Sequence, residues 1–201
     1  MLRIVGGQLK GRRLDTLKGT VVRPTSEKVR EAIFDILRPV FPEWCFLDLF
    51  AGTGGMGIEA LSRGMVRAVF VENDPHVVTV LKKNVSACKL EGRAEVISLP
   101  VQRALKRLKS RYEKFAVIFL DPPYQRNLVE STMQELSESR VLALGGVIIA
   151  EHASRESIKP VYGNLVLDDR RQYGQTVISF FTYHDCKGGL YGKSCCLPGV
   201  V

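Results

Sequence analysis

The sequence predicts an α/β fold in which a mostly parallel β-sheet is flanked by helices. Two observations lead to this prediction: apolar strand-like runs alternate with stretches of helical periodicity, and no internal repeat interrupts the alternation. Apolar runs of this kind are typical of strands buried on both faces. The predicted strands are residues 45–50, 67–72, 93–99, 115–121 and 145–151. The predicted helices between them are residues 54–64, 74–90, 100–112 and 126–139.

The C-terminal part of the predicted sheet follows a different pattern. Residues 164–184 leave no room for a helix and indicate two antiparallel strands joined near Tyr173 and Gly174. Together with the five strands above, they predict a seven-stranded sheet whose last strand is antiparallel to the others.

A helix and a glycine-containing arm precede the first strand of the sheet. Residues 23–40 predict a helix with Thr25 or Ser26 as its N-cap, and Pro39 ends it. Residues 2–22 carry glycines between short alternating runs, as a small β-hairpin would. The sequence therefore predicts an N-terminal hairpin arm in front of the α/β domain.

Length and composition fit a soluble protein with one core. The chain has 201 residues, of which 45% are hydrophobic and 25% charged. It has no apolar run of membrane-spanning length and no signal-peptide pattern, so we expect cytoplasmic residence without membrane contact. The spacing of Cys186, Cys195, Cys196 and His184 matches no zinc pattern, so we expect no metal site.

Positive charge is concentrated at the N-terminus. Residues 1–30 contain eight Lys or Arg against two acids, which is +6 of the total net charge of +8. Clustered cations favour a polyanionic partner because they release counterions from phosphates, although a merely solvated basic terminus would look the same. We divide the chain into a basic arm at 1–22, an α/β domain at 23–185 and a flexible tail at 186–201.

A first chemical motif lies where the predicted strand 115–121 ends. Asp121 is followed by two prolines and Tyr124. Prolines cannot donate to a β-ladder, so the chain must leave the sheet in a stiff turn. Because ligands bind at the carboxyl ends of strands in open α/β sheets, Asp121 is a candidate site residue.

A second motif follows the first predicted strand. Gly52, Gly54 and Gly57 match G-x-G-x-x-G, and Glu72 ends the next strand twenty residues after Gly52. The spacing is that of a dinucleotide-binding loop, in which the acid holds ribose hydroxyls. Asp48 would repel a pyrophosphate but suits the α-amino group and sulfonium of S-adenosylmethionine, so this cofactor is favoured over a nicotinamide. We expect Asp48 and Asp121 to face one crevice.

The ordered set of motifs resembles one family. Segments 3–7, 23–37, 48–64, 121–124 and 173–181 are similar to the RsmD-type guanine-N2 methyltransferases of bacterial small-subunit ribosomal RNA. The resemblance implies a Rossmann-like class I methyltransferase fold. It also implies a 16S rRNA substrate, S-adenosylmethionine as cofactor, no metal, and a monomer bound to the small ribosomal subunit or its assembly intermediate.

The resemblance also implies roles for individual residues. Asp121 and the Pro122 carbonyl would each accept an N–H of the target amine, and Tyr124 would stack on the flipped base. Pro100 stands where the family often has an adenine-binding acid or amide, so Val101 or Gln102 would take that role. The implied cofactor-binding residues are Asp48, Ala51, Gly52, Thr53, Gly54, Glu72, Asn73, Val101, Gln102 and Asp121. The expected RNA-binding residues are Arg3, Lys10, Arg12, Arg13, Arg23 and Arg30.

Several alternatives stay open at this point. Enzymes that methylate adenine N6 or a glutamine amide share the Asp-Pro-Pro-aromatic motif. A non-catalytic RNA-binding protein or a nicotinamide oxidoreductase would keep the fold but not the chemistry. For Arg23 and Arg30, a solvated helix face is as good an interpretation as a phosphate contact or support beside the cofactor mouth. His76, His152 and His184 form no visible constellation.

Overall fold

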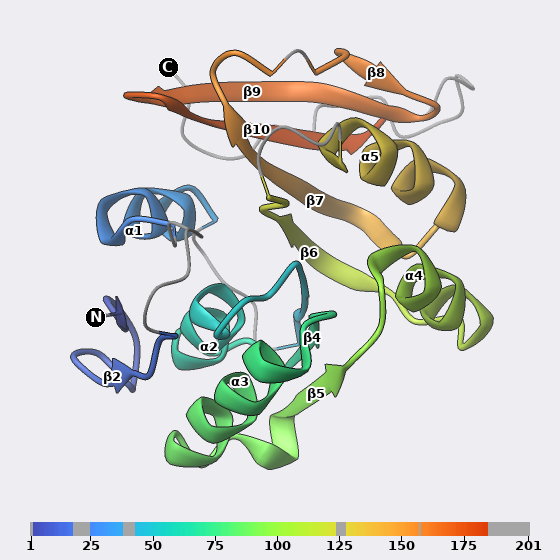
Figure 1. The fold of residues 1–201 in the computed structure, drawn as a ribbon. Coiled ribbons are helices and arrows are strands. Elements are labelled where there is room, and N and C mark those ends of the chain that lie inside the picture. The colour runs from blue at the N-terminus through green and yellow to red at the C-terminus, as the bar shows by residue number, and fades with distance from the viewer. Residues whose placement is uncertain (1, 18–24, 38–42, 124–127, 157, 185–201) are drawn as a thin grey trace.

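The computed structural model describes residues 2–17, 25–37, 43–123, 128–156 and 158–184. They form an eight-stranded sheet with helices on both faces and a small hairpin beside it (Figure 1). The strand order is β5-β4-β3-β6-β7-β10-β9-β8. The order reverses between β3 and β6, and such a switch point is where open α/β sheets bind ligands. The predicted α/β class is therefore confirmed.

Five parallel strands form one side of the sheet, from the edge strand β5 to β7, and all five were predicted. The pairs β3–β4, β3–β6, β4–β5 and β6–β7 are parallel. Their bounds are Cys45–Leu49 for β3, Arg67–Val71 for β4, Ala94–Ile97 for β5, Phe115–Leu120 for β6 and Leu142–Ala153 for β7. The strands β3, β4, β6 and β7 are mostly apolar. Helices cover both faces of the sheet, and strands buried in this way need apolar side chains on both sides.

The remaining strands are antiparallel to their neighbours. β9 (Leu165–Tyr173) and β10 (Thr176–Tyr183) form the predicted pair, and Gly174 has a positive φ of 64° in the turn between them. β10 runs antiparallel to β7. The predicted count of seven strands is wrong by one, because β8 (Val161–Tyr162) adds an edge strand. A strand of two residues is too short to produce a periodic pattern in the sequence.

The helices divide between the two faces of the sheet, with α1, α2 and α3 in one hydrophobic core and α4 and α5 in the other. Their bounds are Glu27–Ile36 for α1, Gly55–Ser62 for α2, Pro75–Ala87 for α3, Val101–Ser110 for α4 and Leu128–Ser139 for α5. Ser26 is the N-cap of α1 and accepts a hydrogen bond from the Val29 N–H, as one of the two predicted caps. None of the helices in these ranges is long and apolar enough to cross a membrane.

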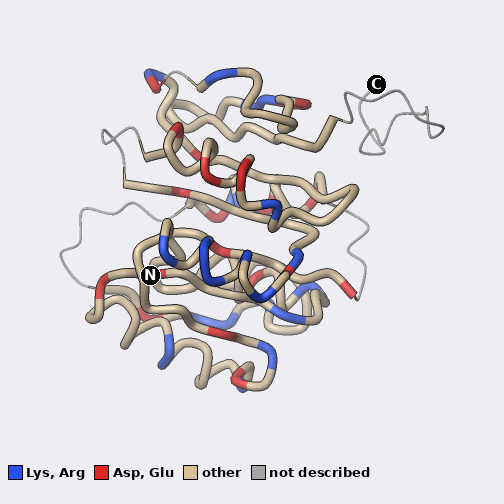
Figure 2. Tube along the Cα trace, turned by 90° about the vertical axis from the view of Figure 1, so that its right-hand side faces the viewer, with Lys and Arg blue, Asp and Glu red and all other residues tan. Residues whose placement is uncertain are grey.

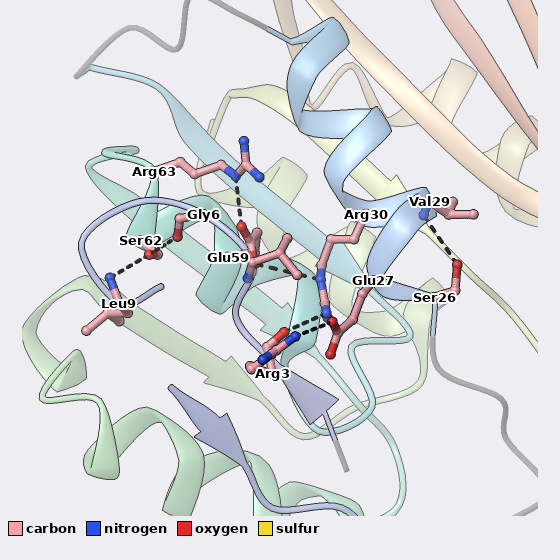
Figure 3. A network of polar contacts seen from close by, with 12 residues as sticks. Arg3, Gly6, Leu9, Ser26, Glu27, Val29, Arg30, Glu59, Ser62 and Arg63 are labelled. Carbon is pink, nitrogen blue, oxygen red and sulfur yellow. Dashed lines mark hydrogen bonds and ion pairs between the residues drawn. The ribbon is translucent and has the colours of Figure 1, made fainter. Parts of the chain in front are cut away.

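The arm is a hairpin that packs onto the core. β1 (Leu2–Arg3) pairs antiparallel with β2 (Arg13–Leu14), as predicted. Leu2, Ile4 and Leu14 are buried in the core shared with α1, α2 and α3. Figure 3 shows the arm residues Gly6 and Leu9 bonded to Ser62 of α2. The arm is thus an integral part of this face of the molecule.

Candidate active site

Three carboxylates stand at the carboxyl ends of adjacent parallel strands. Asp48 lies in β3, Asp121 follows β6, and Glu151 lies near the end of β7. Alternation along each strand assigns their side chains to one face. Phe46, Phe119 and Ile149, each two residues before an acid, all pack in the core of α1, α2 and α3. That shared face explains how acids distant in sequence come together.

Asp48 is enclosed within the protein. It is 2% exposed, and its Oδ2 accepts a hydrogen bond of 2.9 Å from the Gly57 N–H in the first turns of α2. Burial raises the pKa of Asp48 to about 7, and the Glu72 carboxylate adds to the rise, while the Gly57 N–H opposes it. Asp48 therefore titrates near neutral pH and anchors the helix that follows the glycine loop.

Asp121 and Glu151 form a second acidic group beside Asp48. The register pairs Leu120 with Ala150, so the next residue on each strand is an acid. Burial raises the pKa of Asp121 well above its ordinary value, and the charges of Glu151 and Asp48 raise it further. Burial also raises the pKa of Glu151, although a hydrogen bond from the Thr25 hydroxyl opposes that shift.

The glycine loop has one side packed and one side open. A Cβ on Gly54 would lie 2.4 Å from the Leu81 side chain, and one on Gly57 would lie 2.2 Å from the Phe70 ring. A Cβ on Gly52 would meet nothing within 4 Å, although its φ of +54° favours glycine. The second and third glycines are thus required for packing, and the first faces open space.

Glu72 ties the glycine loop to the end of β4. Its Oε2 accepts from the Gly52 N–H at 3.0 Å, and its Oε1 accepts from the N–H groups of Asn73 and Asp74 at 2.7 and 2.9 Å. Each carboxylate oxygen has two lone pairs, so Oε2, which accepts only one of these bonds, can accept a further hydrogen bond from a hydroxyl group.

A pocket of about 160 Å³ lies beside Glu72 at the ends of β4 and β5. It is lined by four residues that the resemblance assigned to the ribose and adenine side, and they come from two separate segments, 72–73 and 101–102. The lining residues are Phe50, Val71, Glu72, Asn73, Leu99, Pro100, Val101, Gln102 and Leu128. Val101 begins α4, and its N-cap Pro100 has no side-chain cap, so backbone N–H groups of this helix start at the pocket.

The remaining assigned site residues have different positions. Pro122 is buried directly after Asp121. Ala51 donates its N–H to the Val71 carbonyl, and the Thr53 carbonyl accepts from the Asn84 side chain, so both help to shape the loop. Tyr124, assigned to base stacking, lies outside the described residues.

Arg30 corrects one expectation for RNA binding. Its side chain is 1% exposed, its Nη2 donates to the Arg3 carbonyl at 2.7 Å, and its Nε lies 3.7 Å from Glu59 Oε2 (Figure 3). A buried and paired guanidinium is not accessible to a phosphate, so neither phosphate contact nor a solvated helix face describes it. Arg23 lies outside the described residues.

The other basic residues assigned to RNA are exposed on the arm. Arg3 pairs with Glu27 of α1 at 3.1 Å, and Arg12 donates to the Ala87 carbonyl at the end of α3. Lys10 and Arg13 are exposed as well. Along the rest of the described chain, basic and acidic positions are interspersed (Figure 2). The net positive charge is therefore concentrated in the N-terminal residues.

Two site residues were missed by the sequence analysis. Glu151 ends an apolar predicted strand, in the same way as Glu72 and Asp121 end theirs, so this pattern was available. Thr25 was considered only as an N-cap, whereas its hydroxyl reaches Glu151 across 126 positions of sequence. Among the described residues, no group of His, Cys, Asp and Glu could hold a metal ion.

The polarity of the site suits S-adenosylmethionine. The open side of Gly52 adjoins Glu72, whose carboxylate suits ribose hydroxyls, and the pocket next to it has apolar walls and backbone N–H groups. Asp48 lies behind the loop as a buried acid. The fold, the glycine loop and the acids at neighbouring strand ends define a class I methyltransferase.

Comparison with known proteins places the chain within that class. It belongs to the RsmD-type family of S-adenosylmethionine-dependent methyltransferases, and the family model described as "Conserved hypothetical protein 95" matches residues 2–182. YlbH of Bacillus subtilis is 37% identical over 180 residues, which cover 90% of this chain and 98% of that protein. The "Ribosomal RNA small subunit methyltransferase D" of Escherichia coli is 34% identical over 180 residues, with 90% and 89% covered. A solved structure from Thermus thermophilus has a TM-score of 0.79 at 35% identity and covers 90% of this chain and 98% of its own.

Proposed function

We propose that this protein transfers a methyl group from S-adenosylmethionine to the exocyclic N2 amine of a guanosine in small-subunit ribosomal RNA. The observation that carries the proposal is the pair of acids Asp48 and Asp121 on one face of adjacent strands, beside a glycine loop with an open side. The similarity to the Escherichia coli protein over 90% of the chain supports an rRNA substrate.

The bound cofactor would supply a methyl group already activated by a positive sulfur. Glu72 would hold its ribose hydroxyls, and the pocket formed with Asn73, Val101 and Gln102 would hold its adenine. Asp48 and the backbone from Ala51 to Gly54 would hold its amino-acid end. An ionised Asp48 attracts the α-amino group, and this attraction offsets part of the cost of burying both charges.

Asp121 and Pro122 would act on the target amine. The lone pair of an exocyclic amine is delocalised into the base, so the amine is a poor nucleophile until its N–H groups are held out of the ring plane. The Asp121 carboxylate and the Pro122 carbonyl can each accept one N–H, and proline fixes φ and so the direction of the chain. Acceptors placed in this way are worth about a hundredfold in rate.

Recognition of the RNA would combine stacking and charge. We assign base stacking to Tyr124, an interaction worth about 1–3 kcal/mol. The exposed cations Arg3, Lys10, Arg12 and Arg13 on the arm would contact phosphates and contribute salt-dependent affinity. We propose a monomer acting in the cytoplasm on the 16S rRNA of the small subunit or its assembly intermediate, with 1–22 as the RNA-contacting arm and 186–201 as a tail outside the enzyme domain.

A methyl-transfer assay with four substrates tests this function. Purified protein and methyl-labelled S-adenosylmethionine are incubated with naked 16S rRNA, assembled small subunits, DNA and a release factor. We expect label only on the rRNA or the subunit, and N2-methylguanosine after digestion to nucleosides. Label on DNA or protein, or N6-methyladenosine in the digest, would contradict the proposal.

A further inference from the structure

The acid at the end of β7 lies directly beside the proposed catalytic acid. Leu120 of β6 pairs with Ala150 of β7, and Asp121 and Glu151 are the next residues. Both side chains belong to the face that carries α1, since Phe119 and Ile149 pack in that core. Glu151 is 3% exposed, and none of the roles proposed above uses it.

Glu151 is fixed from a distant part of the chain. The Thr25 hydroxyl donates to Glu151 Oε2 at 2.7 Å, and both residues are buried. Thr25 stands just before Ser26, the N-cap of α1, so its position depends on that helix. A hydroxyl that donates to one carboxylate oxygen leaves the other free to face a neighbour.

The surroundings of the pair are acidic. Asp48 and Glu156 contribute negative charge from β3 and from the turn after β7, and both raise the pKa of Asp121. From β10, the residue paired with Glu151 is the apolar Ile178. His152 is the next residue of β7 and lies on the opposite face, where its ring contacts Ser179. Within the described ranges, no ion pair includes Asp121 or Glu151.

Two carboxylates on one face at the ends of neighbouring strands each disfavour the ionisation of the other. We propose that Glu151 is a positioning residue that shares one proton with Asp121 and, held by Thr25, directs the ionised oxygen of Asp121 toward the target amine. This inference rests on the methyl transfer proposed above, with Asp121 as the acceptor of the amine N–H.

The proton balance of the reaction agrees with such a pair. Formation of the bond between the amine nitrogen and the methyl carbon breaks the carbon–sulfur bond, whose electrons stay on sulfur. The nitrogen becomes positively charged and loses one proton to the Asp121 carboxylate. The pair then holds two protons, and release of one to water restores the starting state. A neighbour that already carries the first proton leaves Asp121 free to take the second.

A pH–rate profile separates this role from a purely structural one. In Glu151→Gln the neighbour of Asp121 is permanently neutral and can still donate a hydrogen bond. We expect the acid limb of log kcat to stay in place, because Asp121 ionises beside an uncharged neighbour in both proteins. The change in log kcat at higher pH, where the pair loses its shared proton, should disappear in the variant. At pH 8 we expect kcat within about threefold of the original value, because the amide replaces the protonated acid. Glu135→Gln, the same change on α5 at the other face, is the matched control and should leave the profile unchanged.

Thr25 provides an independent test. Thr25→Val keeps the shape but removes the hydroxyl, and we expect kcat to fall about tenfold with an unchanged KM for S-adenosylmethionine. Thr25→Ser should restore the rate. Thr132→Val is the matched control, because Thr132 is fully buried and its hydroxyl has no hydrogen-bond partner among the described residues. A Thr25→Val enzyme with an unchanged kcat would overturn the proposal.

A spectroscopic readout does not depend on catalysis. Infrared absorption at neutral pH should show protonated carboxylic acids, to which Asp48 contributes in every variant. The intensity should fall by one group in Glu151→Gln and stay unchanged in Glu135→Gln. An identical band in all three proteins, or the same change in log kcat at high pH with and without the Glu151 carboxyl group, would overturn the shared proton. If the protein methylates no RNA at all but the band behaves as expected, the proposed function fails and the proton-sharing pair stands.

Discussion

Arg30 of α1 and Glu59 of α2 form an ion pair that is sealed from solvent, at 1% and 0% exposure, with the Arg30 Nε 3.7 Å from Glu59 Oε2. The same Oε2 accepts from the Val5 N–H of the arm at 2.8 Å, and Oε1 accepts from Arg63 Nε at 2.8 Å. One carboxylate thus joins the arm, α1 and the helix after the glycine loop (Figure 3).

Removal of the Glu59 charge should be strongly destabilising. Glu59→Gln leaves the Arg30 guanidinium buried without a counter-charge, and breaking such a pair typically costs about 3–5 kcal/mol. We expect a loss of this size in the free energy of unfolding, measured by urea denaturation. Glu27→Gln is the control, because it removes the exposed pair with Arg3 and should cost less than about 1 kcal/mol. If the two variants lose equal free energy of unfolding, the buried pair stabilises the protein no more than the exposed one.

The glycine loop allows packing and ligand effects to be separated. Gly57→Ala places a Cβ 2.2 Å from the Phe70 ring, so we expect a destabilised protein with a lower Tm. Gly52→Ala places a Cβ in open space, and its positive φ costs about 1–2 kcal/mol. We therefore expect Gly52→Ala to remain folded but to bind S-adenosylhomocysteine at least tenfold more weakly, measured by calorimetry. Normal binding by folded Gly52→Ala would place the cofactor elsewhere.

The titration of Asp48 should appear in the pH dependence of stability. Its pKa is about 7 in the folded protein against an ordinary value of 3.8, so the folded state binds more protons between these values. Stability must then fall as pH rises from about 4 to about 7, by up to about 1.4 kcal/mol per pH unit from this group. In Asp48→Asn, where nothing titrates at this position, the decline measured by urea denaturation should be smaller. A parallel pH dependence in both proteins would show that Asp48 is already ionised.

Loss of Asp121 should separate binding from chemistry. Asp121→Ala removes the acceptor of the amine N–H but leaves the glycine loop and Glu72 intact. We expect S-adenosylhomocysteine affinity within about threefold of the original and methyl transfer reduced by about a hundredfold or more. Calorimetry and the labelled-methyl assay measure the two quantities. Unchanged turnover would refute the role of Asp121.

The sequence predicted those site residues that stand at the ends of well-marked strands. Asp121 and Glu72 follow apolar runs and are succeeded by a breaker or a helix cap, so their place at the carboxyl edge could be inferred. Glu151 also ends a predicted apolar strand, but the residues after it match no motif comparable to Asp-Pro-Pro-Tyr or the glycine loop, so it was overlooked. The error at Arg30 has another cause, since no local pattern shows that Glu59, in a different helix, lies against it.

The basic arm should contribute to RNA affinity through charge. Deletion of 1–22 is a poor test, because Leu2, Ile4 and Leu14 are part of the core and their loss would destabilise the fold. The exposed Lys10 and Arg13 can be changed without disturbing that core. For Lys10→Gln with Arg13→Gln, we expect weaker binding of 16S rRNA. The slope of log K against log salt should become shallower by about 0.7–0.9 for each phosphate that the variant no longer neutralises.

A double substitution on α4 is the matched control for the arm. Lys106→Gln with Arg107→Gln removes the same charge from an exposed helix on the opposite face of the sheet. If phosphates contact the arm specifically, only the arm variant loses salt dependence. If both variants lose salt dependence equally, the cations act through net charge alone, and the arm makes no specific contact with the RNA. At a saturating concentration of RNA, the rate of methyl transfer should be equal in the original protein, the arm variant and the α4 variant. Neither pair of cations lies among the residues that surround Asp121.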